Sequence, residues 1–241
     1  MHTPANAVTV MTSGAFTAAH LALVPWVERF TGKNVVTAAT SIGTGEGSIP
    51  NRLKRGEAVD VVIVADAVLR GFVGDGLIRA ETRTPLARSV IGMAVRAGAP
   101  APDIATAEAL KRTLLEAKSI AYSASVSGQY LTGELYQRLG IAEQVLGKSR
   151  LIGGGERVGA VVARGEAEIG FQQMSELIPV AGIAHITPLP PDLQKVSLFS
   201  AGVAARSADP ETARAVIRFY ASLEAVPAII KSGLEPVALP A

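Results

Sequence analysis

The sequence predicts an α/β protein with two similar lobes, whose mixed, mostly parallel sheets are joined by a hinge that the chain crosses twice. Short apolar, β-branched segments alternate with longer segments of helical periodicity, which is typical of α/β proteins. The same order of segments occurs twice along the chain, and two further strands connect the two sets. We therefore expect one lobe from residues 1–88 and 197–241 and a second lobe from residues 89–196.

The first lobe begins with a β-branched strand, a small-residue turn at Thr12-Ser13-Gly14 and a long helix that ends at Gly32. A loop with several glycines, over 40–47, precedes the next short helix. The unbroken apolar segment after that helix predicts a strand that is covered on both faces. In chain order, we expect a strand over 7–11, a helix over 16–30, a strand over 35–39, a helix over 49–55 and a strand over 59–64.

The second lobe repeats this order. Its turns are the small-residue segment 123–128 and the three glycines 153–155. Leu131, Leu135 and Leu139 recur at four-residue spacing, which predicts one helix. In chain order, we expect a strand over 119–122, a helix over 130–139, a strand over 150–152, a helix over 157–163 and a strand over 169–171.

Two short matches indicate that the lobes share one topology. The tetrapeptide Arg-Gly-Glu-Ala occurs at 55–58 and at 164–167, each time between a helix and an apolar strand. Ser13-Gly14 and Ser127-Gly128 both follow a strand and precede a helix. Two crossings make a hinge, and a ligand is expected in the cleft between the lobes. The connecting strands are expected over 89–96 and 196–205, and helices over 212–223 and 225–231.

Composition excludes several classes of protein. The chain has 241 residues, of which 49% are hydrophobic and 18% charged, so it can fill a core. Its 23 basic and 21 acidic residues form no basic block, and its few aromatic residues (5%) argue against nucleic-acid binding. It contains no Cys and three widely spaced His, and no apolar segment reaches membrane-spanning length. We expect no metal, no cofactor, no membrane insertion and a monomer.

The first seven residues have neither a basic start nor an apolar segment of signal-peptide length. We expect a periplasmic protein if a leader was removed, and a cytoplasmic protein if Met1 is the native start.

In open α/β sheets, ligands bind beyond the carboxyl ends of the strands, where the helices begin. Four turns rich in Ser, Thr and Gly are expected there. Their N–H and hydroxyl groups suit a small anion, although the same residues also serve as ordinary helix caps. The candidate ligand-binding residues are Thr12, Ser13, Gly14, Ser41, Thr44, Ser125, Ser127, Gly128, Arg157, Gln172 and Gln173.

Among these residues, Arg157 would pair with a ligand carboxylate through its planar guanidinium. One of Gln172 and Gln173 should face the cleft, because successive strand residues point to opposite faces. If the protein is an enzyme that moves a proton, its acid/base groups are expected among four side chains. Helix surface, solvated loop or core packing is the alternative role for each. These candidates are Glu46, Glu156, Tyr122 and Tyr130.

The order of elements, the two crossings and the paired turns resemble the type II periplasmic binding proteins, and within these the molybdate-binding proteins of ABC importers. The segments that carry the resemblance are 55–66, Ser127-Gly128 and 165–170, and it covers about residues 8–236. It implies a two-lobed fold, a small anionic ligand and, for an exported protein, an ABC permease as partner.

The resemblance to the molybdate-binding proteins is incomplete at the expected site. That family holds its oxyanion with serines in the first two loops, and Ala15 stands at the first of these positions, with Ser13 nearby. Ser41 fits the second loop, but an insertion over 42–48 follows it. Gln173 stands where a tyrosine is expected. These differences favour a larger organic acid over molybdate.

Segments 13–19 and 170–173 also resemble aconitate isomerase, an enzyme on the same scaffold that shifts a double bond in a tricarboxylate. The sequence thus leads first to a binding protein for a small anion, with a carboxylate ahead of an oxyanion. The alternative is an isomerase of an unsaturated polycarboxylate that works by proton transfer. A cytoplasmic ligand sensor with a protein partner is a third class, for which the sequence has no feature of its own.

Overall fold

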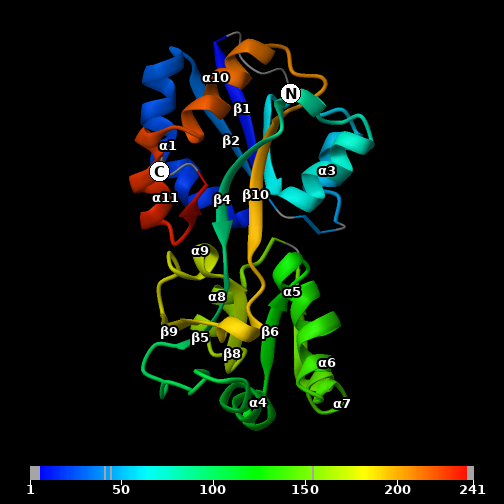
Figure 1. The fold of residues 1–241 in the computed structure, drawn as a ribbon, viewed down its shortest axis with the longest axis vertical. Coiled ribbons are helices and arrows are strands. Elements are labelled where there is room, and N and C mark those ends of the chain that lie inside the picture. Colours follow the sequence, from blue (N-terminus) through cyan, green and yellow to red (C-terminus); the bar gives the residue numbers. More distant parts are fainter. Residues whose placement is uncertain (1–5, 41, 44, 154, 238–241) are drawn as a thin grey trace. The chain divides into compact units, whose positions relative to one another are not determined.

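The computed structural model describes residues 6–40, 42–43, 45–153 and 155–237. The chain divides into two compact units, unit 1 (Met1–Ser89 and Ser197–Ala241) and unit 2 (Val90–Val196). Each unit contains one mixed β-sheet with helices on both of its faces (Figure 1). The predicted α/β class with two mixed sheets is therefore confirmed.

Unit 1 has a six-stranded sheet. Its elements are β1 Ala7–Thr12, α1 Gly14–Thr31, β2 Asn34–Ala39, α2 Ile49–Lys54, β3 Val61–Ala65, α3 Asp66–Gly74, the 3-10 turn η1 Ala80–Thr82, β4 Thr84–Ser89, β10 Ser197–Val203, α10 Pro210–Tyr220, the 3-10 turn η5 Leu223–Ala225, α11 Val226–Lys231 and β11 Glu235–Pro236. The strand order is β11-β4-β10-β3-β1-β2, with β1 parallel to β2 and β3 and with β10 antiparallel to β3 and β4. Helices α1, α10 and α11 cover one face of this sheet, and α3 lies on the other (Figure 1).

Unit 2 has a five-stranded sheet. Its elements are β5 Ile91–Arg96, α4 Ala107–Glu116, β6 Ile120–Ser123, α5 Val126–Tyr130, the π-helical turn η2 Leu131–Leu135, α6 Tyr136–Arg138, α7 Ala142–Val145, the 3-10 turn η3 Leu146–Lys148, β7 Ser149–Ile152, α8 Val158–Ala163, β8 Ile169–Gln173, α9 Met174–Leu177, β9 Ile183–Pro188 and the 3-10 turn η4 Pro191–Leu193. The strand order is β7-β6-β8-β5-β9; β6 is parallel to β7 and β8, and β5 is antiparallel to β8 and β9.

The two units share a strand order and a repeated turn. Strands β2-β1-β3-β10 in unit 1 match β7-β6-β8-β5 in unit 2, both in order and in direction. The Arg-Gly-Glu-Ala segments precede the equivalent strands β3 and β8. Their glycines, Gly56 and Gly165, have φ values of 73° and 75°, a conformation that favours glycine. Each glycine also lies under a guanidinium, that of Arg206 or Arg96. The backbone conformation and the close guanidinium therefore explain why glycine occurs in both tetrapeptides.

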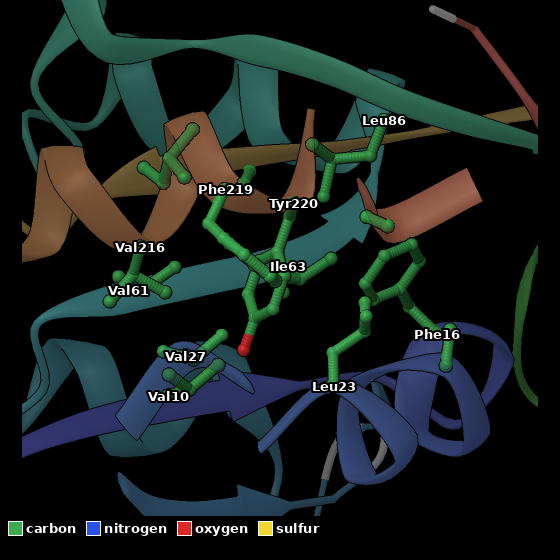
Figure 2. Packing of buried hydrophobic residues seen from close by; sticks show 14 of the residues in the cluster. Val10, Phe16, Leu23, Val27, Val61, Ile63, Leu86, Val216, Phe219 and Tyr220 are labelled. Carbon is green, nitrogen blue, oxygen red and sulfur yellow. The ribbon is translucent and has the colours of Figure 1, made fainter. Parts of the chain in front are cut away.

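The central strand of unit 1 is buried on both faces. Val61 and Ile63 of β3 pack with residues of α1 and α10, whereas Val62 and Val64 pack with residues of α2 and α3. Figure 2 shows the first of these clusters, in which Tyr220 lies among side chains from α1, β1 and β3. The predicted covering of this strand on both faces is therefore confirmed.

A buried histidine braces this first cluster. His20 of α1 is fully buried; its Nδ1 lies 2.6 Å from the Tyr220 hydroxyl and its Nε2 lies 2.8 Å from Thr37 Oγ1. Burial lowers the pKa of His20 to about 4, so the imidazole is neutral at physiological pH. The histidine therefore joins α1, α10 and β2 through hydrogen bonds.

The connections between the units differ from the two predicted connecting strands. Segment 89–96 is not one strand, because β4 ends at Ser89 in the sheet of unit 1 and β5 begins at Ile91 in the sheet of unit 2. The strand expected over 196–205 is β10, a member of the sheet of unit 1. Ser89 and Ser197 are register partners, so the chain leaves and re-enters unit 1 at neighbouring points.

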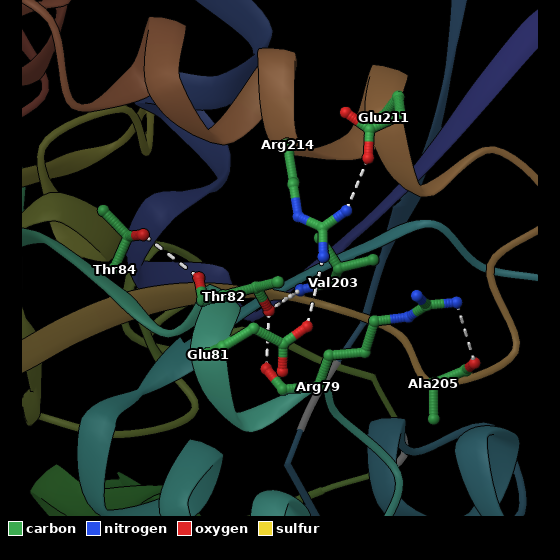
Figure 3. Close-up of polar contacts among 8 residues, drawn as sticks. All are labelled: Arg79, Glu81, Thr82, Thr84, Val203, Ala205, Glu211 and Arg214. Atoms are coloured by element: carbon green, nitrogen blue, oxygen red, sulfur yellow. Dashed lines mark hydrogen bonds and ion pairs between the residues drawn. The ribbon is translucent and has the colours of Figure 1, made fainter.

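Polar contacts attach the segment before β4 to β10 and α10 (Figure 3). Thr82 Oγ1 donates to the Arg79 carbonyl at 2.6 Å and accepts from the Val203 N–H at 2.9 Å. Arg214 of α10 pairs with Glu81 at 3.1 Å. Thr82 therefore satisfies a backbone group of β10 that lies outside the regular ladder.

The predicted helix over 130–139 begins earlier, at Val126, and the first turn of α5 packs very closely against the end of β6. A Cβ atom at Gly128 would overlap the Ser123 carbonyl oxygen. We predict that Gly128→Ala lowers the free energy of unfolding by at least about 2 kcal/mol, because backbone atoms must move apart. Urea unfolding followed by circular dichroism measures this change.

Gly133→Ala is the matched control on the same helical segment. A Cβ atom there meets nothing within 4 Å. This variant should be neutral or more stable by about 0.5–1 kcal/mol, because alanine favours the helix. Equal losses of stability in both variants would contradict the explanation.

Candidate functional site

The carboxyl edge of unit 1 is the edge of its sheet where the parallel strands β1, β2 and β3 end. Thr12 pairs with Ala39 in register, and the Thr40 N–H donates to the Thr12 carbonyl at 3.1 Å. Ser13 caps α1, and its N–H donates to the Ile63 carbonyl at 2.9 Å. These bonds fix Ser13 by its backbone at the point where the predicted binding turn lies.

The hydroxyl of Ser13 is buried and unused. Ser13 is 6% exposed, and its Oγ has no hydrogen-bond partner among the described residues. The Thr12 hydroxyl, in contrast, donates to the Ser13 carbonyl at 3.0 Å. Gly14 begins α1, whose first N–H groups have no acceptor within the helix. Ser13 and the first turn of α1 are therefore available to an anion, whereas the Thr12 proton is engaged.

The loop before α2 holds a second unused hydroxyl. Ser48 caps α2 and is buried, and its Oγ has no partner in the described part of the chain. Sequence analysis missed this residue, although it is the last residue of the insertion over 42–48. Glu46 is exposed, and its carbonyl accepts a hydrogen bond from Arg55 at 2.7 Å. The predicted site residues Ser41 and Thr44 lie outside the described residues.

The carboxyl edge of unit 2, where β6, β7 and β8 end, holds a chain of serine hydroxyls. Ser123 Oγ lies 2.7 Å from Ser125 Oγ, which lies 3.1 Å from Ser127 Oγ. Ser127 is fully buried, and Gly128 follows it in the first turn of α5, close to the Ser123 carbonyl. The structure thus brings together Ser125, Ser127 and Gly128, and adds Ser123 to them.

Gln172 and Gln173 end β8, and both are buried. Phe171 belongs to the core under α5, whereas Gly170 faces Val158 and Val162 of α8, so Gln172 lies on the α8 side. Its Nε2 donates to Glu176 Oε2 at 2.7 Å, and its Oε1 has no partner among the described residues. The predicted amide pair is therefore in place, with one member bonded to an acidic side chain.

Glu176 is a further candidate at this edge, which sequence analysis missed. The residue is partly exposed, yet burial of its carboxyl group raises the pKa to about 7; the positive charge of Arg157 and the Gln172 hydrogen bond oppose this effect. Its position four residues after Gln172, at the end of an apolar strand, is the signal that the sequence contained.

The other charged candidates lie on the loop before α8. Arg157 is its N-cap residue and is exposed, and its charge acts on Glu176. Glu156 is also exposed and pairs with Arg164, which also pairs with Glu166 at 2.6 Å. Glu156 is therefore held in a surface ion pair.

The two candidate tyrosines have structural contacts. Tyr122 is partly buried and packs against the core of unit 2. The Tyr130 hydroxyl donates to the Leu193 carbonyl at 2.8 Å and accepts from Arg138 at 3.0 Å. Its phenolic proton is therefore engaged, and burial raises the pKa of Tyr130 although Arg138 opposes this effect.

Other features of the described residues do not add to either edge. Their His, Asp and Glu side chains form no group of three or more that could hold a metal ion. None of the helices in the described ranges is long and apolar enough to cross a membrane. A surface hollow of about 350 Å³ in unit 2 is lined by Arg96, Lys118 and Glu168, at the opposite, amino-terminal ends of β6 and β8.

Comparison with known proteins assigns the family. A family model described as bacterial extracellular solute-binding protein matches residues 8–235. The chain belongs to this family. An aconitate isomerase from a Pseudomonas species is 43% identical over 235 residues, which cover 97% of this chain and 89% of that protein.

Solved structures of solute-binding proteins share the fold. The periplasmic molybdate-binding protein of Azotobacter vinelandii matches with a TM-score of 0.72 and 19% identity, over 97% of this chain and 100% of that one. The sulfate-binding protein SubI of Mycobacterium tuberculosis matches with a TM-score of 0.75 and 17% identity, over 96% and 87%. The type II periplasmic-binding-protein fold predicted from the sequence is therefore confirmed.

The unused hydroxyl of Ser13 leads to a stability prediction. Ser13→Ala should change the free energy of unfolding by no more than about 0.5 kcal/mol, because no hydrogen bond is lost. Ser200→Ala is the control: this buried hydroxyl donates to Asp66 Oδ1 at 2.7 Å, and its loss should cost about 1.5–3 kcal/mol. Urea unfolding of the two variants measures both values, and a loss in Ser13→Ala as large as that in Ser200→Ala would show that Ser13 stabilises the fold.

The pKa of Glu176 leads to a pH prediction. The folded protein holds this proton more tightly than the unfolded chain does, so ionisation of Glu176 costs folding free energy. The stability of the wild type relative to Glu176→Gln should therefore fall as the pH rises from about 4.5 to about 7 and then become constant. Urea unfolding of both proteins across this range checks the sign, and a difference that does not vary with pH would contradict the raised pKa.

Proposed function

We propose that this protein binds an unsaturated tricarboxylate and interconverts its cis and trans isomers, as an aconitate isomerase. One observation carries this proposal: 43% identity, over 97% of the chain, to a protein named aconitate isomerase. Identity of this extent is much closer than the 17–19% shared with the molybdate- and sulfate-binding structures. Those proteins support the fold, and the isomerase supports the chemistry.

The groups at the two carboxyl edges suit such a ligand. A tricarboxylate carries charges several bonds apart, so it needs donors at separate points. Unit 1 offers the unused hydroxyls of Ser13 and Ser48, and unit 2 offers the serine chain and the guanidinium of Arg157. A buried hydroxyl without a hydrogen-bond partner is costly and gains most from an anionic acceptor.

The reaction requires little besides positioning and one proton carrier. The methylene group of the substrate lies next to a carboxylate and to the double bond, so loss of its proton gives a carbanion whose charge spreads over both. Hydrogen-bond donors that hold the carboxylates stabilise this charge. A single carboxyl or phenol can remove the proton and return it to the other end of the allylic system.

Capture without turnover is the second candidate, because the family is one of solute-binding proteins. In that case the same ligand would be held for an ABC permease or a sensor. A molybdate ligand is less well supported, since Gln173 and Ala15 stand where the molybdate-binding proteins are expected to have their tyrosine and serine.

We predict that the wild type converts cis-aconitate to trans-aconitate. Proton NMR measures this conversion. In Arg157→Ala, binding of either isomer should weaken by tenfold or more, about 1.4 kcal/mol, because the guanidinium that would pair with a ligand carboxylate is lost. Calorimetric titration measures the affinity. Binding without conversion would leave a solute-binding protein.

Arg150→Ala is the matched control, because Arg150 is an exposed arginine in β7 of the same unit and pairs only loosely, at 4.0 Å, with Glu166. Its affinity should equal that of the wild type. If Arg157→Ala also binds aconitate as tightly as the wild type does, Arg157 does not pair with the ligand, and the tricarboxylate proposal is left without a cation to support it. A rise in melting temperature with molybdate rather than with aconitate would overturn the proposal.

A further inference from the structure

At the carboxyl edge of unit 2, the carboxyl group of Glu176 is fixed by a hydrogen bond but is not paired with a cation in the described part of the chain. Glu176 Oε2 accepts from Gln172 Nε2 at 2.7 Å, and the described residues offer its other oxygen, Oε1, no hydrogen-bond partner. Gln172 is only 4% exposed, and its own Oε1 is also without a partner in the described part of the chain. A buried amide that makes a single bond to a carboxylate orients that carboxylate and leaves one of its oxygens available.

Glu176 lies next to groups that would hold the ligand. Tyr122 and Phe171 are register partners, so Gln172 is level with Ser123, the first member of the serine chain. Gln172 shares the α8 side of the sheet with Gly170, which faces Val158. Arg157 immediately precedes Val158, and its charge acts on Glu176. The carboxyl group of Glu176 is therefore within range of the charge of Arg157, and the amide that holds it is level with the first hydroxyl of the serine chain.

Asp66 and three of the four predicted acid/base candidates are committed elsewhere or exposed. Asp66 accepts from Arg83 at 2.7 and 2.9 Å and from Ser200 at 2.7 Å, so both of its oxygens are used. Glu156 is paired with Arg164 on the surface, and Glu46 is exposed on its loop. The Tyr130 proton is donated to Leu193. Among these candidates, Glu176 alone combines a fixed orientation with a free oxygen.

We infer that Glu176 is the group that carries the proton in the isomerisation, and that Gln172 positions it. This inference rests on the proposed function. Glu176 takes a proton from the methylene carbon, and the electrons of that C–H bond enter the allylic system. The carboxyl group then returns the proton to the former vinyl carbon, so one C–H bond breaks, one forms and the double bond moves by one position. Nothing is oxidised or reduced, and the bound orientation of the methylene carboxylate sets the new double-bond geometry.

The electrostatic surroundings agree with this role. A general base works best when its pKa lies near the working pH, and burial raises the pKa of Glu176 to about 7. Of the elements packed against α9, β8 has no titratable residue, and the Arg96 of β5 lies at the far end of that strand. The His185 of β9 is exposed at an irregularity, and the Arg157 before α8 is the charge that acts on the carboxyl.

The test compares Glu176→Gln with Glu143→Gln, an exposed glutamate of α7 in the same unit. Conversion of cis-aconitate is followed by NMR in D2O, which also reports deuterium entering the methylene group. We expect Glu176→Gln to lose at least about a hundredfold in kcat and to lose deuterium incorporation, while binding cis-aconitate within about threefold of the wild type. Glu143→Gln should match the wild type in all three measurements.

The pH profile separates proton transfer from a structural role. The kcat/KM of the wild type should fall as the pH drops below about 7. Loss of the Gln172 hydrogen bond in Gln172→Leu should move this acid limb of the pH profile to higher pH, because the bond lowers the pKa of Glu176. Glu176→Asp, which keeps a carboxyl group, should retain more activity than Glu176→Gln.

Each outcome is decisive. Conversion by Glu176→Gln within about threefold of the wild type would overturn the inference and leave the proposed function standing. An acid limb that Gln172→Leu leaves in place would remove Gln172 as the positioning residue. No conversion by the wild type, despite binding, would overturn the proposed function and this inference with it.

Discussion

Burial of a central strand on both faces is the constraint on which each unit depends. All five residues of β3 and all five of β8 are buried, with successive side chains entering opposite layers. Such a strand excludes water along its whole length, so polar groups can gather only where it ends. The same constraint that builds the core therefore places buried serines, amides and carboxyl groups at the carboxyl edge of each sheet.

The two units treat the acid that follows the central strand differently. Asp66 comes directly after β3, and its hydrogen bonds to Arg83 hold the pKa of that carboxyl below its usual range. Glu176 comes shortly after β8 and has one amide donor and the charge of Arg157, so burial dominates and the pKa rises. A fully paired acid stabilises the fold and is chemically inert at neutral pH, whereas a poorly paired one exchanges its proton there.

The repeated tetrapeptide shows how similar local solutions build both units. Gly56 and Gly165 take positive φ values where a helix turns into the central strand, and the guanidinium of Arg206 or Arg96 covers the turn. In each case the following glutamate pairs with an arginine of the same region, Arg52 or Arg164. Similarity at such turns follows from backbone geometry and carries no information about the ligand, which is consistent with one fold serving molybdate, sulfate and an isomerase.

Most of the candidate site could be outlined from the sequence, because Ser13, Ser127, Gly128, Gln172 and Gln173 lie at the ends of strands with clear apolar periodicity. The pattern could not tell which of these groups are engaged. Thr12 and Ser13 look alike in the sequence, yet Thr12 donates its proton to a carbonyl and Ser13 does not. The sequence does not distinguish Glu156 from Glu176. In the structure, Glu156 pairs with Arg164, whereas the carboxyl group of Glu176 is buried.

The sequence by itself determined the α/β class, the two-lobed plan and the strand ends where polar residues collect, because periodicity and turn residues are local properties. The tertiary structure alone decided that segment 89–96 divides between two sheets, that Ser48 and Glu176 join the polar edges, and that Glu176 holds its proton near neutral pH. These features depend on burial and on partners from distant parts of the chain, and burial is a property of the packed fold rather than of any segment.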